Sequence, residues 1–276
     1  MIAFKHTIFA LPFAVISLIT AATPGWPEPR VWLWVAVAMV TARTAAMTFN
    51  RLADHALDAE NPRTATRALP AGRLSRSFGW TITGLSAVIF LLAAAELNRL
   101  CLYLAPPTLV VLLGYSYAKR FTAGAHLWLG IALGIAPVGA WIAVTGHLSW
   151  PPLVLAAAVS FWVAGFDVIY SLQDESFDRA HALLSLPVRF GGRRSLRVAR
   201  LFHLLAFIGF GVFAAAAGGG PLRLGAVAGA GLLLAWQHRL IRAHNLQRVD
   251  VAFFTTNGAL AILMCLFFLI AKFIDA

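Results

Sequence analysis

The chain has 276 residues, of which 60% are hydrophobic and 12% are charged, with a mean hydropathy of +0.79 and a formal net charge of +11. Soluble domains carry roughly a quarter of charged residues, so this composition excludes a soluble protein and predicts a polytopic membrane protein in a lipid bilayer. The positive charge does not indicate a nucleic-acid partner, because the Lys and Arg residues stand in short loops between apolar runs, where the positive-inside rule expects them.

Apolar runs recur along the whole chain. A membrane-spanning helix needs about 20 mostly apolar residues, and the N-terminal run, which has no small-residue cleavage pattern, is interpreted as the first span. The predicted spans lie near residues 7–22, 31–49, 78–96, 99–117, 126–145, 151–170, 198–217, 222–238 and 252–273. The sequence therefore predicts an all-α protein with nine transmembrane helices, organised as a single domain over residues 1–276.

The second predicted span leads into an acidic segment. Asn50, Asp54 and Asp58 follow one another at intervals of four residues, which places them on one face of a helix. Their oxygen atoms suit Mg²⁺, a hard cation that also binds substrate phosphates. A solvated helix end with scattered acids is the alternative interpretation of the same spacing. The next loop contains Arg63 and Arg67, which can hold phosphate oxygens.

Two further loops carry polar side chains of the same kinds. Lys119 and Arg120 follow the fourth predicted span and can neutralise a phosphate. The sixth predicted span ends in a second acidic segment, which contains Asp167, Asp174 and Asp178. Asp174 and Asp178 repeat the four-residue interval, and Asp167 precedes Asp174 by seven residues, so all three share a helix face together with Tyr170.

The basic residues predict the orientation of the chain. With nine spans, 18 of the 22 Lys and Arg residues fall on one side of the membrane and 4 fall on the other. The positive-inside rule places the richer side in the cytoplasm. The sequence thus predicts a multi-pass protein of the cell (inner) membrane whose N-terminus and two acidic segments are cytoplasmic.

The acidic residues are concentrated where carboxylates are costly. Seven of the eleven Asp and Glu residues lie in or beside the two acidic segments, and charged groups near a bilayer usually mark functional sites. Metal ions held between two acidic helix ends and bridged by a diphosphate would account for both segments. Cys101 and Cys265 stand far apart in apolar runs and indicate neither a disulfide framework nor a zinc site.

Taken together, these segments resemble the UbiA superfamily of intramembrane aromatic prenyltransferases, in its 4-hydroxybenzoate polyprenyltransferase-like branch. The resemblance covers nearly the whole chain and rests on the N-x-x-x-D-x-x-x-D pattern at Asn50, the D-x-x-x-D pattern at Asp174 and the segments around them. These segments are residues 4–13, 43–47, 61–64, 67–72, 115–122 and 165–170. Ala182 and Leu184 differ from this branch, in which Gly and His are frequent at these positions.

The resemblance implies nine helices around a central cavity, Mg²⁺ as cofactor, a polyprenyl diphosphate donor and an aromatic carboxylic acid acceptor. It implies that Mg²⁺ is bound by Asn50, Asp54, Asp58, Asp174 and Asp178, with Asp167 as a further ligand or partner. Arg63, Arg67, Lys119 and Arg120 are then expected to hold the diphosphate. The base that removes the proton from the acceptor ring is left open between Asp167 and water.

The acceptor needs a cation for its carboxylate. Arg43 is the first candidate, because it precedes Asn50 by seven residues and so lies on about the same helix face. Tyr170 and His6 are further candidates for acceptor contacts, although a single His is more often structural.

Two alternatives to prenylation of 4-hydroxybenzoate for ubiquinone biosynthesis are considered. A naphthoate acceptor on a menaquinone route fits the same residues, and an ion-coupled transporter would also contain acidic residues within the membrane. The position of both acidic segments at the cytoplasmic ends of spans, away from the bilayer midplane, favours an enzyme over a transporter.

Overall fold

The computed structural model describes residues 9–241, 246 and 248–275, and within these residues every regular element is helical. The prediction of an all-α fold is therefore confirmed. His6, expected to contact the acceptor, and the first residues of the first predicted span lie outside the described residues.

Seven helices in the described part of the chain are long and apolar enough to cross a membrane. They correspond to seven of the nine predicted spans, and they identify a multi-pass membrane protein. The two remaining predicted spans coincide with α1 (Leu11–Ala21), which has 11 described residues, and with α11 (Pro221–Leu240), whose ends contain Arg223 and Arg239. The count of nine spans stays a prediction.

The described residues divide into two compact units. Glu28–Ala118 belong to the first unit, and the second combines the segment that ends at Pro27 with the segment that begins at Lys119. Each unit contains one of the two acidic segments. The prediction that residues 1–276 form one domain is not tested by this division and stays a prediction.

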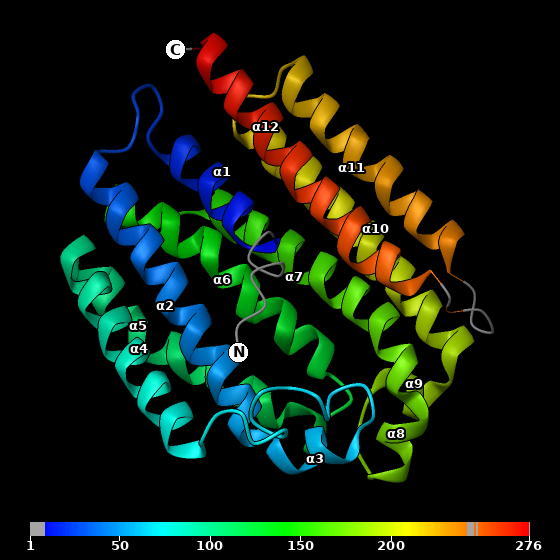
Figure 1. The fold of residues 1–276 in the computed structure, drawn as a ribbon. Helices are drawn as coiled ribbons and strands as arrows, with labels where there is room; N and C mark the ends of the chain where they lie inside the picture. Colours follow the sequence, from blue (N-terminus) through cyan, green and yellow to red (C-terminus); the bar gives the residue numbers. More distant parts are fainter. Residues whose placement is uncertain (1–8, 242–245, 247, 276) are drawn as a thin grey trace. The chain divides into compact units, whose positions relative to one another are not determined.

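The first unit consists of α2 (Pro29–Ala53), α3 (His55–Glu60), α4 (Arg76–Leu97) and α5 (Arg99–Gly114). Figure 1 shows α2 beside the hairpin of α4 and α5. Side chains fix the starts of the last two helices: the Ser75 hydroxyl accepts a hydrogen bond from the amide of Phe78, and Asn98 accepts one from Cys101. Such caps satisfy amide groups that have no partner inside the helix.

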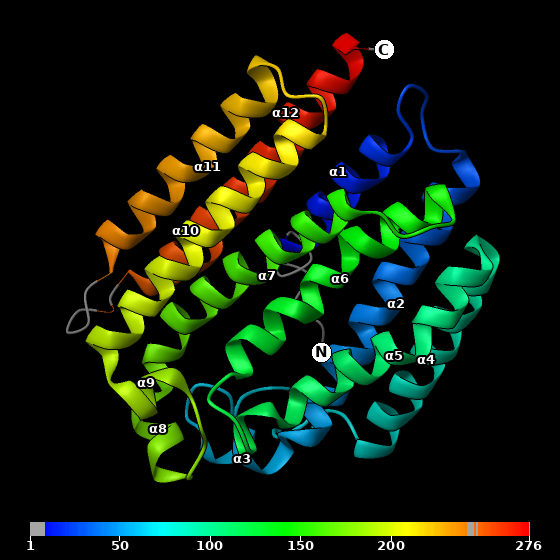
Figure 2. The same ribbon diagram turned by 180° about the vertical axis from the view of Figure 1, so that it is seen from behind.

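The second unit is built around α7 (Trp150–Ser171), which packs against α6 (Ala125–Thr145) and α10 (Gly192–Ala216), as Figure 2 shows from behind. The helices α8 (Glu175–Ala180) and α9 (Leu186–Phe190) connect α7 to α10. The last helix, α12 (Asn257–Asp275), follows a π-helical turn at Val251–Thr256. A 3-10 turn, Tyr115–Arg120, leads from the end of α5 into this unit.

Aromatic rings fill the core of the second unit. Trp162 of α7 is fully buried, and its ring lies 5.2 Å from Phe13 of α1 and 5.1 Å from Phe166, centroid to centroid. The indole N–H donates to the side-chain oxygen of Asn257 at 2.9 Å. The buried polar edge of the ring is thus satisfied, as a buried indole requires, and α1, α7 and α12 are joined around it.

Two glycines bring α6 and α7 into close contact. A Cβ atom on Gly130 would overlap the backbone carbonyl oxygen of Ser160, and one on Gly134 would lie 2.6 Å from the carbonyl oxygen of Ala156. Gly130 and Gly134 are four residues apart and lie on one face of α6, an arrangement that lets membrane helices approach closely. The approach of the two backbones fixes which side chains meet at the ends of these helices.

We predict that Gly130→Ala lowers the thermal stability of the detergent-solubilised protein, because the new methyl group meets backbone that cannot rotate away. Overpacking of this kind costs about 1–3 kcal/mol. The matched control is Gly139→Ala on the same helix, where nothing lies within 4 Å of the added Cβ; there the better helix propensity of Ala should keep or raise the melting temperature. Equal melting temperatures for the two variants would contradict the close packing.

Candidate functional site

The first acidic segment spans a break between two helices. The helix α2 ends at Ala53 and α3 begins at His55, with Asp54 between them at φ −98° and ψ 12°. Of the three residues expected on one continuous helix face, Asn50 therefore lies on α2, Asp58 on α3 and Asp54 at the break between them. Helical hydrogen bonds continue across the break, from the Asp54 amide to the Asn50 carbonyl at 3.0 Å and from the Asp58 amide to the Asp54 carbonyl at 2.7 Å.

Side chains in this segment interact directly. The Asn50 amide donates to the Asp54 carboxylate at 2.9 Å. Asp58 is buried, and its Oδ1 accepts from the guanidinium of Arg67 at 2.6 Å, while Nη1 of Arg51 lies 3.8 Å from Oδ2. The Arg67 expected to hold a phosphate is therefore already next to one of the expected metal ligands.

The loop between α3 and α4 folds so as to bring Arg67 to Asp58. The Asn61 side chain accepts from the amide of Arg63 at 3.0 Å, and the Thr64 hydroxyl donates to the Asp58 carbonyl at 3.0 Å. Short polar side chains of this kind stabilise tight turns. Arg63 is exposed, and Arg43 lies on α2 two helical turns before Asn50.

The donor atoms of the first segment fit Mg²⁺. They are amide and carboxylate oxygens, the ligands that this cation prefers. The Oδ2 atom of Asp58 is buried and receives no hydrogen bond from any described residue, and such an oxygen is suited to a cation. The described residues contain no ready cluster of three or more His, Cys, Asp or Glu side chains around one position. Metal binding through all five predicted ligands stays a prediction.

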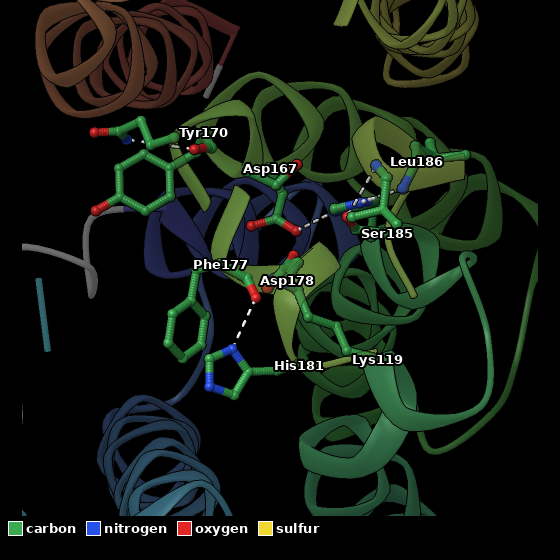
Figure 3. A network of polar contacts seen from close by, with 12 residues as sticks. Lys119, Asp167, Tyr170, Phe177, Asp178, His181, Ser185 and Leu186 are labelled. Carbon is green, nitrogen blue, oxygen red and sulfur yellow. Dashed lines mark hydrogen bonds and ion pairs between the residues drawn. The ribbon is translucent and has the colours of Figure 1, made fainter. Parts of the chain in front are cut away.

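The second acidic segment begins where α7 ends. A 3-10 turn, Leu172–Asp174, follows α7 and passes into α8. Asp174 and Asp178 are both buried, and Nζ of Lys119 lies 2.9 Å from Oδ2 of Asp178. Figure 3 shows this ion pair beside Asp167. Lys119 is thus placed in the same way as Arg67, as a cation on a buried carboxylate.

Lys119 also holds the chain that follows α8. Its carbonyl accepts from the amide of Leu184 at 2.7 Å, and the amide of Leu183 donates to the Asp178 carbonyl at 2.8 Å. Ala182 has a φ of 53°, a left-handed conformation that favours Gly.

Asp167 has a partner that the sequence did not predict. The Nδ1 atom of His126 lies 2.7 Å from Oδ2 of Asp167, and the His126 ring is fully buried at the start of α6. The other ring nitrogen, Nε2, accepts from the amide of Leu186 at 3.4 Å. The sequence does show a histidine at the start of an apolar span, which could have marked a polar contact. Its partner Asp167 could not be identified from the sequence, because it is 41 residues away.

Tyr170 packs against aromatic rings. Its ring lies 4.2 Å from that of Phe253 and 6.5 Å from that of Phe254, centroid to centroid, on the π-helical turn before α12. Its carbonyl accepts from the side chain of Gln173 (Figure 3). An acceptor contact for Tyr170 stays a prediction.

The predicted site residues fall into two sets. Within the first unit the structure brings together Asn50 with Asp54 and Asp58 with Arg67, and within the second unit Asp178 with Lys119. Arg120 is exposed at the end of the 3-10 turn that also carries Lys119. The prediction that both sets bind one ligand rests on their motifs.

We predict that Lys119→Ala destabilises the protein by about 1–3 kcal/mol, because the carboxylate of Asp178 would remain buried without its partner. The control is Arg179→Ala, which removes an ion pair with Glu175 that is largely exposed and is worth little. Melting temperatures in detergent give the comparison. The double variant Lys119→Ala/Asp178→Ala should recover part of the loss; no recovery would show that the charge of Asp178 is not the cause.

Comparison with known proteins gives consistent matches. The model of the UbiA prenyltransferase family matches residues 10–269. The 4-hydroxybenzoate octaprenyltransferase of Aromatoleum aromaticum is 29% identical over 257 residues, which are 93% of this chain and 87% of that protein.

Solved structures show the same fold. The apo structure of a UbiA homolog from Aeropyrum pernix K1 is 33% identical, has a TM-score of 0.88 and covers 98% of this chain and 99% of its own. A UbiA homolog from Archaeoglobus fulgidus, bound to DMAPP and Mg²⁺, has a TM-score of 0.74 at 17% identity, with 97% of this chain and 96% of its own covered.

Proposed function

Because this chain belongs to the UbiA prenyltransferase family, we propose that it transfers a polyprenyl group from a polyprenyl diphosphate to an aromatic acid, with 4-hydroxybenzoate as the acceptor. The observation that carries the proposal is the match of the family model over residues 10–269. The name of the Aromatoleum relative supports the acceptor and a place in ubiquinone biosynthesis. A chain with at least seven candidate membrane spans suits a donor whose long apolar tail stays in the lipid.

The buried carboxylates and their cations support recognition of a diphosphate. We assign Mg²⁺ binding to Asn50, Asp54, Asp58, Asp174 and Asp178, and the A. fulgidus homolog is a family member seen with Mg²⁺ and a prenyl diphosphate. When bound, Mg²⁺ neutralises negative charge that builds up on the leaving diphosphate. Arg67 and Lys119, which lie beside Asp58 and Asp178, add positive charge for the same oxygens, as do the exposed Arg63 and Arg120.

The reaction follows from this placement of charge. The bond between the allylic carbon and the diphosphate oxygen breaks, and its electron pair leaves with the diphosphate. The ring carbon ortho to the phenol hydroxyl attacks the cation-like allylic carbon, and the ring proton then passes to a base. Asp167 and water are the two candidates for that base. Stabilising the charge on the leaving group is usually the largest contribution to catalysis of such a step.

We assign recognition of the acceptor carboxylate to Arg43. This residue lies on α2, two helical turns before Asn50 and on about the same face. We propose that both acidic segments face the cytoplasm, where water-soluble aromatic acids occur. With nine spans, 18 Lys and Arg residues fall on that side of the membrane and 4 fall on the other, which supports this orientation.

We predict that Asp54→Ala and Asp174→Ala each abolish prenyl transfer while the protein still inserts into membranes. Each change removes an oxygen donor for the cation that holds the diphosphate. Transfer is measured by mass spectrometry of the product in isolated membranes. Glu96→Gln is the control, because Glu96 pairs with Arg30 on the surface of the first unit. Full activity of either Asp variant would reject the assignment of these ligands.

Chelation should stop the reaction reversibly. We expect EDTA to remove prenyl transfer from membranes and Mg²⁺ to restore it, because the carboxylates alone would repel the diphosphate. Ca²⁺, which prefers more ligands and longer bonds, should restore less. Unchanged transfer in EDTA would contradict the metal requirement while leaving the family assignment intact.

A panel of acceptors should identify the aromatic substrate. We expect prenylated product from 4-hydroxybenzoate and little from 1,4-dihydroxy-2-naphthoate. Arg43→Ala should reduce use of the acceptor far more than hydrolysis of the donor, since only the acceptor has a carboxylate for this residue to bind. Equal loss of both reactions would remove Arg43 from the acceptor site, and product from the naphthoate alone would place the enzyme on a menaquinone route.

A further inference from the structure

We propose that His126 is a positioning residue for Asp167: its imidazole holds the Asp167 carboxylate through Nδ1 and ties it to the backbone at Leu186 through Nε2. This inference rests on the proposed function, in which Asp167 is one of the two candidates for the base that takes the ring proton. It adds a residue to which the sequence motifs assign no role.

The two hydrogen bonds define the state of the imidazole. Nε2 accepts from the Leu186 amide, so this nitrogen carries no proton. The ring proton of a neutral imidazole then resides on Nδ1, which donates it to Oδ2 of Asp167 at 2.7 Å. A backbone amide on one side and a carboxylate on the other therefore select one tautomer and one ring orientation, as outer partners do for reacting groups.

Helix packing makes this geometry rigid. His126, Gly130 and Gly134 succeed one another at four-residue intervals on one face of α6. Gly130 and Gly134 let this face approach Ser160 and Ala156 of α7 so closely that a methyl group would not fit. His126 lies on this face one helical turn before Gly130, and its ring is fully buried beside Asp167. The imidazole thus has no freedom to turn away from the carboxylate.

The same contact connects Asp167 to the segment after the second acidic motif. Leu186 begins α9, and Leu184, two residues before it, is held by the carbonyl of Lys119, whose ammonium group pairs with Asp178. Figure 3 shows Asp167, Asp178, Lys119 and Leu186 in this network. Asp167 and Asp178 are consequently held through one set of contacts, so a change at His126 should alter the reaction more than the affinity for either substrate.

Substitutions can separate the two bonds of the imidazole. Asn has an amide N–H close to the position of Nδ1 but no atom at Nε2, so His126→Asn can keep the bond to Asp167. His126→Ala keeps neither bond. His147, an exposed residue just beyond the other end of α6, supplies the matched control His147→Asn.

The test is a double-mutant cycle of prenyl transfer in membranes, with wild type, His126→Ala, Asp167→Ala and the double variant. We expect His126→Ala to lower kcat on the order of 10- to 100-fold, as loss of an outer partner usually does, with little change in KM. The double variant should be no slower than Asp167→Ala alone, because His126 acts through Asp167. His126→Asn should recover most of the activity, and His147→Asn should match wild type.

Two outcomes would overturn the proposal: losses that multiply in the double variant, or a His126→Asn variant as slow as His126→Ala. Melting temperatures of the same four proteins in detergent give a second measure of coupling that does not need turnover. If wild type transferred no prenyl group to any acceptor, the proposed function would fail and with it the catalytic role of the pair. Coupled melting temperatures would then still establish the contact itself.

Discussion

The pairing of buried carboxylates with cationic or N–H donors is the interaction on which both acidic segments depend. A carboxylate taken out of water near a bilayer is costly unless it is paired and hydrogen-bonded. Here the buried Asp58 is paired with Arg67 and the buried Asp178 with Lys119, while the half-buried Asp167 is paired with the buried His126. Each partner lies outside the element that carries its carboxylate: Arg67 in the loop after α3, Lys119 in the 3-10 turn after α5, and His126 in α6. The pairs therefore also connect these elements.

These pairs give the cations two compatible roles. In the protein alone, Arg67 and Lys119 balance the charge of buried Asp side chains. In the proposed reaction the same cations lie where phosphate oxygens bind, and a divalent metal takes over part of the charge balance at the carboxylates. A site that is neutralised before its anionic ligand arrives avoids an isolated buried charge in either state.

The helices of the second unit are held together mainly by close packing of backbone and aromatic rings. The glycine face of α6 brings its backbone against α7, and the aromatic core around Trp162 joins α7 to α1 and α12. The π-helical turn before α12 is stabilised by Gln237 and Asn257, whose side-chain amides both donate to the carbonyl of Ala252. This turn also contains Phe253, whose ring packs against that of Tyr170.

The sequence by itself determined the class of the protein and the positions of its helices. Apolar runs of about 20 residues are strongly constrained to be helical, because the helix is the structure in which a single segment satisfies its own backbone hydrogen bonds in lipid. Seven of the predicted spans appear as helices close to the predicted residues. The spacing of Asn50, Asp54 and Asp58 and of Asp174 and Asp178 could be recognised for a similar reason, since four-residue intervals are local.

Only the tertiary structure decided which side chains meet. The break at Asp54, the ion pair between Lys119 and Asp178 across 59 residues and the contact of His126 with Asp167 across 41 residues follow from how helices and loops pack. Sequence periodicity shows which residues share one face of a helix. It does not show which other helix packs against that face. That information lies in the packing of α6 against α7, where the absence of side chains at two glycines sets the distance between the helices.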